Sequence, residues 1–263
     1  MDATFFVVRH GQTLFNVMGK VQGWCDTPLT DEGVRAARSL GRGLANVDFT
    51  AAYSSDSGRA VQTLQEVLDS RAAERAAMRL DEPAGDAPRV AAEGVRSAAD
   101  GRAILCRRFE PDGGGGSPIP IAQDARLREW CYGDLEGEPG ELLHQTFAQG
   151  FGRELSFAEL NSRLPEVADV IAAADRSGRA ERFADIESRL RGFFEDAGRA
   201  AFEAGGGNVL VVTHSFVVRT MVYLLEPSRV NDPLKILNAS VTKLAFDGER
   251  FSLGDVGSMA YAR

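Results

Sequence analysis

The sequence predicts a three-layer α/β fold, in which helices cover both faces of a mostly parallel central sheet of about six strands. The runs Thr4–Val8 and Asn208–Val212 are apolar without alternating polar residues, which is typical of strands buried on both faces. Strand patterns alternate with helix patterns over the first part of the chain. Near the C-terminus, two short strand patterns flank an Asp-Gly pair, which predicts a β-hairpin at one edge of the sheet.

The N-terminal part predicts two strand–helix pairs. The first strand ends at Arg9, and the helix after it begins at Thr30, a favourable N-cap that two acidic residues follow. A second strand covers Phe49–Tyr53, and its helix begins near Ser57 or Gly58.

Residues 71–117 interrupt this alternation. The segment is rich in Ala, Gly, Pro and Arg and contains the breaker sequences DEPAGDAP and PDGGGGSP. We therefore expect a surface insertion with one strand at Arg102–Cys106, and its residues indicate no function. The strand pattern resumes at Pro120–Ala122.

A long helical segment, residues 141–204, predicts a cap. It is mostly amphipathic and is broken near Pro165 and at Ser177–Gly178. The hairpin strands are expected at Val241–Phe246 and Phe251–Val256. With 263 residues, the chain is long enough for a single domain, 1–263, that carries the insertion and the cap.

Composition excludes some classes of partner. The 30 Lys and Arg residues against 38 Asp and Glu residues give a net charge of −8, which argues against nucleic acid or an anionic membrane as the main partner. No apolar run approaches the roughly 20 residues of a membrane span, and no signal-peptide pattern precedes the first strand, so we expect a cytoplasmic protein. Cys25, Cys106 and Cys131 lack C-x-x-C spacing, which indicates neither a disulfide framework nor a zinc site.

Two of the three histidines follow the two buried strands directly. His10 and His214 each stand where an apolar run stops and a turn towards a helix begins. Ligands of open α/β sheets bind at the carboxyl ends of the strands, so we expect these two side chains to share a site. His144 lies in a polar helical stretch and receives no role.

Basic and small residues around the first histidine predict a site for a dianion. Arg9 precedes that histidine and Arg59 opens the second helix, and guanidinium groups and helix N-termini suit phosphate oxygens. Gly11 allows a sharp turn close to a ligand. Thr13 and Asn16 offer neutral donors on the next turn.

Five sequence blocks carry a resemblance to a known family. They are RHGQTLFN (Arg9–Asn16), GWCDTPLTDEG (Gly23–Gly33), SSDSGRAVQT (Ser54–Thr63), LREWCYGDLEG (Leu127–Gly137) and VVTHS (Val211–Ser215). In order and spacing they resemble the histidine phosphatase superfamily, the clan of phosphoglycerate mutase-like enzymes. The resemblance does not reach the 71–117 insertion.

The resemblance implies a covalent mechanism without a metal or another cofactor. His10 would attack phosphorus to form a phosphohistidine, which requires one unprotonated ring nitrogen, and a backbone carbonyl bonded to the other nitrogen can arrange this. Glu129 would protonate the leaving oxygen and later activate water. His214 would bind the phosphoryl oxygens together with the other expected phosphate-binding residues, which are Arg9, Gly11, Thr13, Asn16, Gly23, Arg59 and Ser215.

Departures from the family pattern bear on the reaction. Phosphoglycerate mutases of the clan have an arginine where this chain has Trp130, and the acid-phosphatase branch has an aspartate where this chain has Ser215. The first departure removes a basic group for a second anion, and the second leaves Glu129 as the proton donor. We therefore expect a phosphatase that acts on a small phosphorylated metabolite.

Several alternatives stay open at this point. Phosphoglycerate mutase-type transfer is one, and a non-catalytic protein that binds phosphorylated ligands is another. Trp130 fits either a substrate with a flat part or a structural role, while Asp134 and Glu136 are expected to be exposed loop acids. An exposed edge strand near the hairpin would also suit a homodimer.

Overall fold

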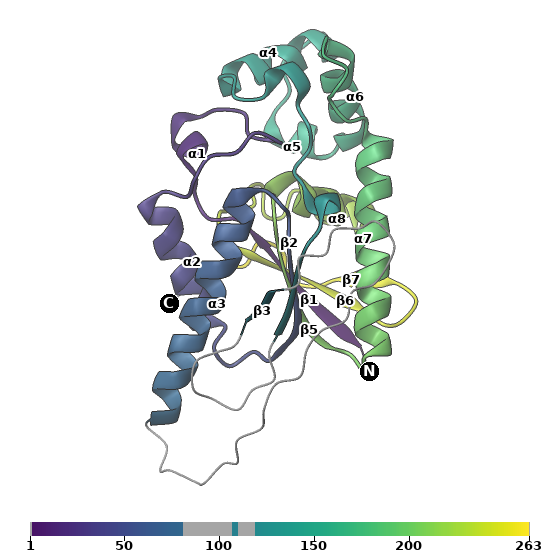
Figure 1. Ribbon diagram of the computed structural model, residues 1–263. Coiled ribbons are helices and arrows are strands. Elements are labelled where there is room, and N and C mark those ends of the chain that lie inside the picture. The colour runs from purple at the N-terminus through teal and green to yellow at the C-terminus, as the bar shows by residue number, and fades with distance from the viewer. Residues whose placement is uncertain (1, 81–106, 110–118, 263) are drawn as a thin grey trace.

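The computed structural model describes residues 2–80, 107–109 and 119–262 (Figure 1). The strands are β1 Ala3–Arg9, β2 Phe49–Ser54, β3 Arg107–Phe109, β4 Ile119–Gln123, β5 Gly207–Thr213, β6 Val241–Phe246 and β7 Phe251–Leu253. The α-helices are α1 Leu14–Met18, α2 Asp31–Gly43, α3 Gly58–Leu80, α4 Gly140–Phe151, α5 Phe157–Asn161, α6 Leu164–Ala174, α7 Phe183–Glu203 and α8 Ser215–Leu225. Short 3₁₀ turns are η1 Ala125–Leu127, η2 Gly133–Leu135 and η3 Pro227–Arg229.

One sheet holds all the described strands, in the order β3-β4-β2-β5-β1-β6-β7. The four strands β4, β2, β5 and β1 run parallel, whereas β3, β6 and β7 are antiparallel to their neighbours. The mostly parallel sheet and the C-terminal hairpin are thus confirmed, with seven strands where about six were expected. The strand predicted at 102–106 lies outside the described residues.

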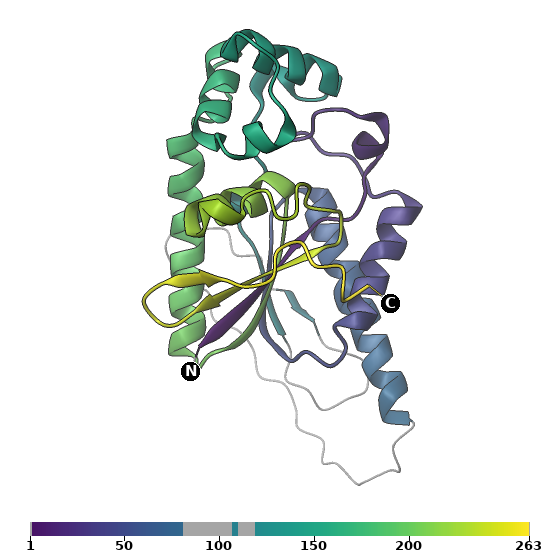
Figure 2. The same ribbon diagram turned by 180° about the vertical axis from the view of Figure 1, so that it is seen from behind.

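The central strand β1 is covered on both faces. Phe5 and Val7 belong to a core shared with α7 and α8, while Phe6 and Val8 belong to a second core shared with α2 and α3. Successive side chains of a strand point to opposite faces, so the uninterrupted apolar run fills both cores. Figure 2 shows α7 on one side of the sheet and α2 and α3 on the other.

The predicted cap segment contains two kinds of helix. Helices α4, α5 and α6 lie at the end of the molecule opposite the N-terminus, beyond the carboxyl ends of the parallel strands (Figure 1). Helix α7 instead lies along the sheet, where Phe194 packs against Phe5 with ring centroids 6.1 Å apart. Within 141–204, only α4, α5 and α6 therefore lie beyond the sheet layer.

Residues 71–80 are helical, which differs from the expectation of an insertion that begins at residue 71. Residues 71–80 continue helix α3, and Arg71 bonds from that helix to the carbonyls of Leu44 and Val47. Ala-rich sequence supports a helix as well as it supports a loop, which explains the difference. Among the described residues, no helix is both long enough and apolar enough to cross a bilayer.

Candidate active site

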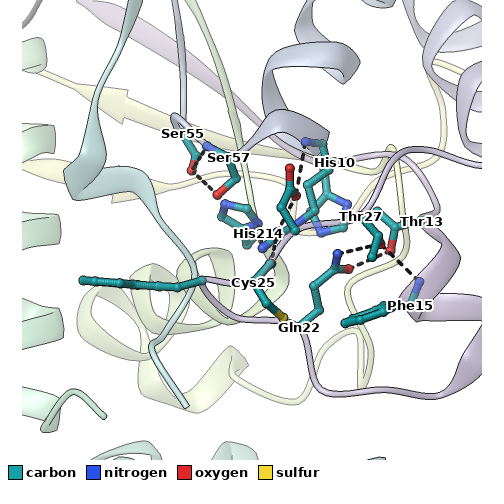
Figure 3. A network of polar contacts seen from close by, with 12 residues as sticks. His10, Thr13, Phe15, Gln22, Cys25, Thr27, Ser55, Ser57 and His214 are labelled. Atoms are coloured by element: carbon teal, nitrogen blue, oxygen red, sulfur yellow. Dashed lines mark hydrogen bonds and ion pairs between the residues drawn. The ribbon is translucent and has the colours of Figure 1, made fainter. Parts of the chain in front are cut away.

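His10 and His214 meet at the carboxyl edge of the sheet. Strands β1 and β5 pair in parallel, and the His10 amide donates to the Thr213 carbonyl at 2.8 Å. The two imidazole ring centroids lie 5.2 Å apart. Figure 3 shows the two side chains from close by. The parallel pairing of the two buried strands thus brings the two histidines together.

The neighbours of His10 determine its tautomer. Nδ1 lies 2.8 Å from the Gly11 carbonyl, which can only accept, so Nδ1 carries the proton and Nε2 keeps a lone pair. Burial, followed by the charges of Arg59 and Arg9, holds the pKa of His10 well below its ordinary value. The ring is therefore neutral near pH 7, with Nε2 as a nucleophilic atom.

His214 has the opposite tautomer. Its Nδ1 lies 3.1 Å from Nη2 of Arg59, which can only donate, so the proton sits on Nε2. Burial, followed by the charge of Arg59, holds the pKa of His214 well below its ordinary value as well. Nε2–H of His214 is buried and has no hydrogen-bond partner in the described part of the chain.

Arg59 is fully buried at the start of α3. Its guanidinium donates to the carbonyls of Gly23 at 2.7 Å and Cys25 at 2.8 Å, and to the Asp26 carboxylate at 2.9 Å. These contacts hold Arg59 in one position against His214 and leave its buried Nε without a partner among the described residues.

Arg9 completes the group of donors. Its Nη1 donates to the Ile236 carbonyl at 2.6 Å, and desolvation lowers the pKa of Arg9 to about 10. Its Nε is buried and unpartnered in the described structure, as are Nε of Arg59 and Nε2 of His214. A buried N–H group without a hydrogen-bond partner costs free energy. Three such groups at the carboxyl edge of the sheet therefore favour the binding of an anionic ligand.

The loop after His10 is held by internal hydrogen bonds. The Gly11 amide donates to Thr63, and the Thr13 hydroxyl donates to Gln22, whose amide nitrogen donates to Thr27 (Figure 3). Both donors have internal acceptors in this structure, and the expected phosphate-binding roles of Gly11 and Thr13 stay predictions. These two residues shape the loop.

Asn16 and Asn238 act together beside this loop. The Asn238 side chain donates to the His10 carbonyl at 2.9 Å and to Oδ1 of Asn16 at 3.3 Å. With Oδ1 also accepting from the Thr13 amide, Asn16 has its Nδ2 group left to donate. Sequence reasoning did not find Asn238, because no strand end or motif singles it out.

Glu129 is buried next to the second histidine. Its Oε2 accepts from the Phe216 amide at 3.1 Å and lies 3.4 Å from the Ser215 hydroxyl, while Oε1 accepts from the Trp130 amide. Burial raises the pKa of the Glu129 carboxyl above its ordinary value. Ser215 opens α8, where first-turn amides have no partner within the helix.

Glu136 is an internal anchor. Its carboxylate accepts from the amides of Gly23, Trp24, Cys25 and Tyr132 at 2.8 to 3.0 Å, so the expectation of an exposed loop acid is wrong. The Gly23 amide donates to this carboxylate, and the expected phosphate-binding role of Gly23 stays a prediction. Asp134, in contrast, is exposed as expected.

Trp130 has a structural role. It is 1% exposed, its indole nitrogen donates to the Thr220 hydroxyl at 3.2 Å, and its ring packs against Phe183 and Phe216. Of the two alternatives for Trp130, the structural role is the one that its burial in the core supports.

The two described thiols and the third histidine add no second reactive centre. Burial raises the pKa of Cys25 to about 12 and raises that of Cys131, which makes both thiols poor nucleophiles near pH 7. His144 packs against aromatic rings of α4 and α5. Within the described ranges, no cluster of three or more His, Cys, Asp or Glu residues is arranged to hold a metal.

A family model described as "Histidine phosphatase superfamily (branch 1)" matches residues 5–85 and 112–258. The chain belongs to this superfamily. This match confirms the resemblance of the five sequence blocks. The two histidines, the two arginines and Glu129 of the site described above belong to those blocks.

The names of this chain's relatives describe different activities. The chain is 26% identical to 2,3-bisphosphoglycerate-dependent phosphoglycerate mutase 2 of Gloeobacter violaceus, over 85% of this chain and 76% of that protein. It is 36% identical to mouse fructose-2,6-bisphosphatase TIGAR, over 55% of this chain and 61% of that protein. The structure of a phosphoglycerate mutase from Bacillus anthracis superposes with a TM-score of 0.77 at 30% identity, covering 99% of this chain and 95% of that one.

Proposed function

We propose that this protein is a phosphomonoester hydrolase that works through a phosphohistidine at His10. Membership of the histidine phosphatase superfamily supports phosphoryl transfer or hydrolysis in general. The observation that carries the proposal is the pair of opposite tautomers, a lone pair on Nε2 of His10 and a proton on Nε2 of His214. A nucleophile and a donor to a phosphoryl oxygen are what phosphoryl transfer to histidine requires.

In the first step, Nε2 of His10 attacks phosphorus as the bond from phosphorus to the ester oxygen breaks. The leaving oxygen takes the proton of Glu129, whose buried carboxyl has a raised pKa and can hold that proton. Arg9, Arg59 and His214 donate to the phosphoryl oxygens as charge develops on them.

In the second step, the Glu129 carboxylate takes a proton from water. The water oxygen forms a bond to phosphorus while the bond from phosphorus to Nε2 breaks, which returns the lone pair to His10. Inorganic phosphate leaves, and both Glu129 and His10 regain their starting protonation states.

The buried Trp130 side chain favours hydrolysis over phosphoryl transfer of the mutase type. Mutases hold a second anion with an arginine at this place, whereas here the side chain is buried between aromatic rings. The neighbouring Arg128 is paired with Asp56 through two contacts of 2.6 and 2.7 Å. Neither Trp130 nor Arg128 therefore offers a free cation for a second phosphate or a carboxylate, which supports a small metabolite with one phosphoryl group.

Release of phosphate from p-nitrophenyl phosphate tests the hydrolase. We expect turnover by the wild type, none by His10→Ala, and an acid-labile phosphoryl label on His10 after rapid quench. A folded wild type without turnover would overturn the proposal and favour a non-catalytic binding protein. Isomerisation of 3-phosphoglycerate, primed with 2,3-bisphosphoglycerate, that outpaces phosphate release would show a mutase instead.

A further inference from the structure

Arg189 extends from helix α7 to the backbone that carries Glu129. Its Nη1 donates to the carbonyls of Arg126 at 2.7 Å and Arg128 at 2.6 Å, and its Nη2 donates to the Glu129 carbonyl at 3.1 Å. One side chain thus binds three carbonyls of the acid block, which we define as residues 126–131. The guanidinium suits this task because its donors form a rigid fork.

Glu181 holds the other side of the same block. Its carboxylate pairs with Arg189 through contacts of 2.7 and 3.0 Å and also accepts from the Cys131 amide at 2.9 Å. The two side chains are 14% and 12% exposed, so water screens the pair little. Together, Arg189 and Glu181 bind the backbone on both sides of Glu129.

The acid block needs such external contacts. After the 3₁₀ turn at Ala125–Leu127, residues 128–132 belong to no helix and no strand, so no regular ladder satisfies their carbonyls. The Glu129 carboxylate, however, must reach the Phe216 amide and the Trp130 amide at once. A small shift of the Glu129 backbone would move the carboxylate away from the leaving oxygen.

We propose that Arg189, bracketed by Glu181, is a positioning residue for the proton donor Glu129. This inference rests on the proposed function, because it assigns the α7 contacts to one step of that reaction. Arg189 acts through the backbone of the acid block and does not touch the substrate.

A positioning role predicts a loss that depends on the leaving group. Alkyl phosphates release a basic alkoxide that needs the proton of Glu129, whereas p-nitrophenolate leaves without it. In Arg189→Met we expect kcat/KM to fall on the order of 100-fold for an alkyl phosphate. For p-nitrophenyl phosphate the fall should stay below about 3-fold, since kcat/KM reports only the steps up to formation of the phosphohistidine.

The experiment measures kcat/KM over a series from p-nitrophenyl phosphate through phenyl phosphate to glycerol 2-phosphate. Glu129→Gln provides the reference pattern, and Glu181→Gln is a second variant should Arg189→Met fail to fold. Arg189→Lys should lose less kcat/KM than Arg189→Met, because lysine keeps the positive charge but not the rigid fork of guanidinium donors. Asp196→Asn is the matched control: it removes another α7 ion pair, of 2.7 Å to the Arg126 side chain, and leaves the three carbonyl contacts of Arg189 in place.

Two outcomes overturn the inference while leaving the proposed function intact. One is an equal loss for every substrate in Arg189→Met and Glu181→Gln, which indicates a purely structural role. The other is no loss for the alkyl phosphate. A folded wild type that hydrolyses none of the substrates contradicts the proposed function itself, so the two failures are distinguishable.

Discussion

At the scale of single residues, the two histidine side chains of the site differ in tautomer, because the Nδ1 atom of each ring has a different hydrogen-bond partner. A carbonyl beside Nδ1 of His10 forces the proton onto that nitrogen, and the Arg59 guanidinium beside Nδ1 of His214 forces the proton to the other end of the ring. Burial keeps both rings neutral near pH 7. The proposed roles of nucleophile and donor therefore follow from the neighbours of each ring and not from the residue type.

The pH dependence of kcat/KM for an alkyl phosphate should reflect these pKa shifts. His10 must be unprotonated, and its pKa lies well below 6.5, so the acid-side loss should appear only below that pH. Glu129 must be protonated, and its pKa is raised, so activity should fall as pH rises through that raised value. The measurement is a kcat/KM profile for the wild type and Glu129→Gln.

In Glu129→Gln the alkaline fall should disappear, while the ionisation of the substrate itself affects both profiles equally. An alkaline limb that persists unchanged in this variant would contradict the assignment of Glu129 as the proton donor.

Sequence reasoning identifies residues that follow buried strands, and it misses those defined by distant contacts. His10, Arg9 and His214 stand at strand ends, and Arg59 opens a helix, so local patterns locate them. Asn238 binds the carbonyl of a residue 228 positions away, and Glu136 binds amides more than 100 positions away. Their roles arise from tertiary packing, for which one sequence carries no local signal.

At the scale of elements, helix α2 packs tightly against the loop that follows His10. Thr30 caps the helix by accepting from the Gly33 amide, and the Thr30 amide donates to the Gln12 carbonyl. A Cβ atom on Gly33 would lie 2.1 Å from the Gln12 carbonyl oxygen, and one on Gly11 would lie 2.7 Å from the Gly33 carbonyl oxygen. Only glycine at both positions permits this approach.

The variant Gly33→Ala should push α2 away from the loop that follows His10. We expect a loss of about 1 to 3 kcal/mol in the free energy of unfolding, together with a fall in kcat/KM for p-nitrophenyl phosphate. Urea denaturation and steady-state kinetics measure the two effects. Arg35→Ala, an exposed change on the same helix, should alter both little; a Gly33→Ala variant as stable and active as the wild type would count against the close packing.

Helices and strands that have a clear capping residue or a buried face can be predicted from the sequence. Short elements without buried residues cannot. Helix α2 begins after Thr30 as expected, because that side chain caps it. Helix α1 was missed, since it has five residues and none of them is buried. The hairpin follows from the Asp-Gly pair, and the Asp247 carboxylate accepts from the amides of Glu249 and Arg250 in the turn.

At the scale of the whole molecule, the site exists only when distant parts of the chain are in place. Strand β1 supplies Arg9 and His10, helix α3 supplies Arg59, the acid block supplies Glu129, and the junction of β5 and α8 supplies His214. A ligand that bridges these groups binds the folded chain and not the unfolded one, so it must stabilise the fold.

Inorganic phosphate should therefore raise the free energy of unfolding by about 2.7 kcal/mol at 100 times its dissociation constant. Urea unfolding with and without phosphate measures the effect. Arg59→Met in the same buffers is the control, because general salt effects act on both proteins. An equal gain in the variant would show that phosphate acts without the arginine and histidine donors.

The central place of β1 in the sheet also determines when the nucleophile can reach its working position during synthesis. Ala3 pairs with Gly207 on one side and with Phe246 on the other, so both neighbours of β1 are made long after it. At ribosomal rates of about 5 to 20 residues per second, roughly 10 to 50 s pass before both edges of this apolar strand are paired. During that interval the apolar run Phe5–Val8 lacks both neighbouring strands, and the proposed phosphohistidine chemistry is not available until the last quarter of the sequence has been translated and folded onto it.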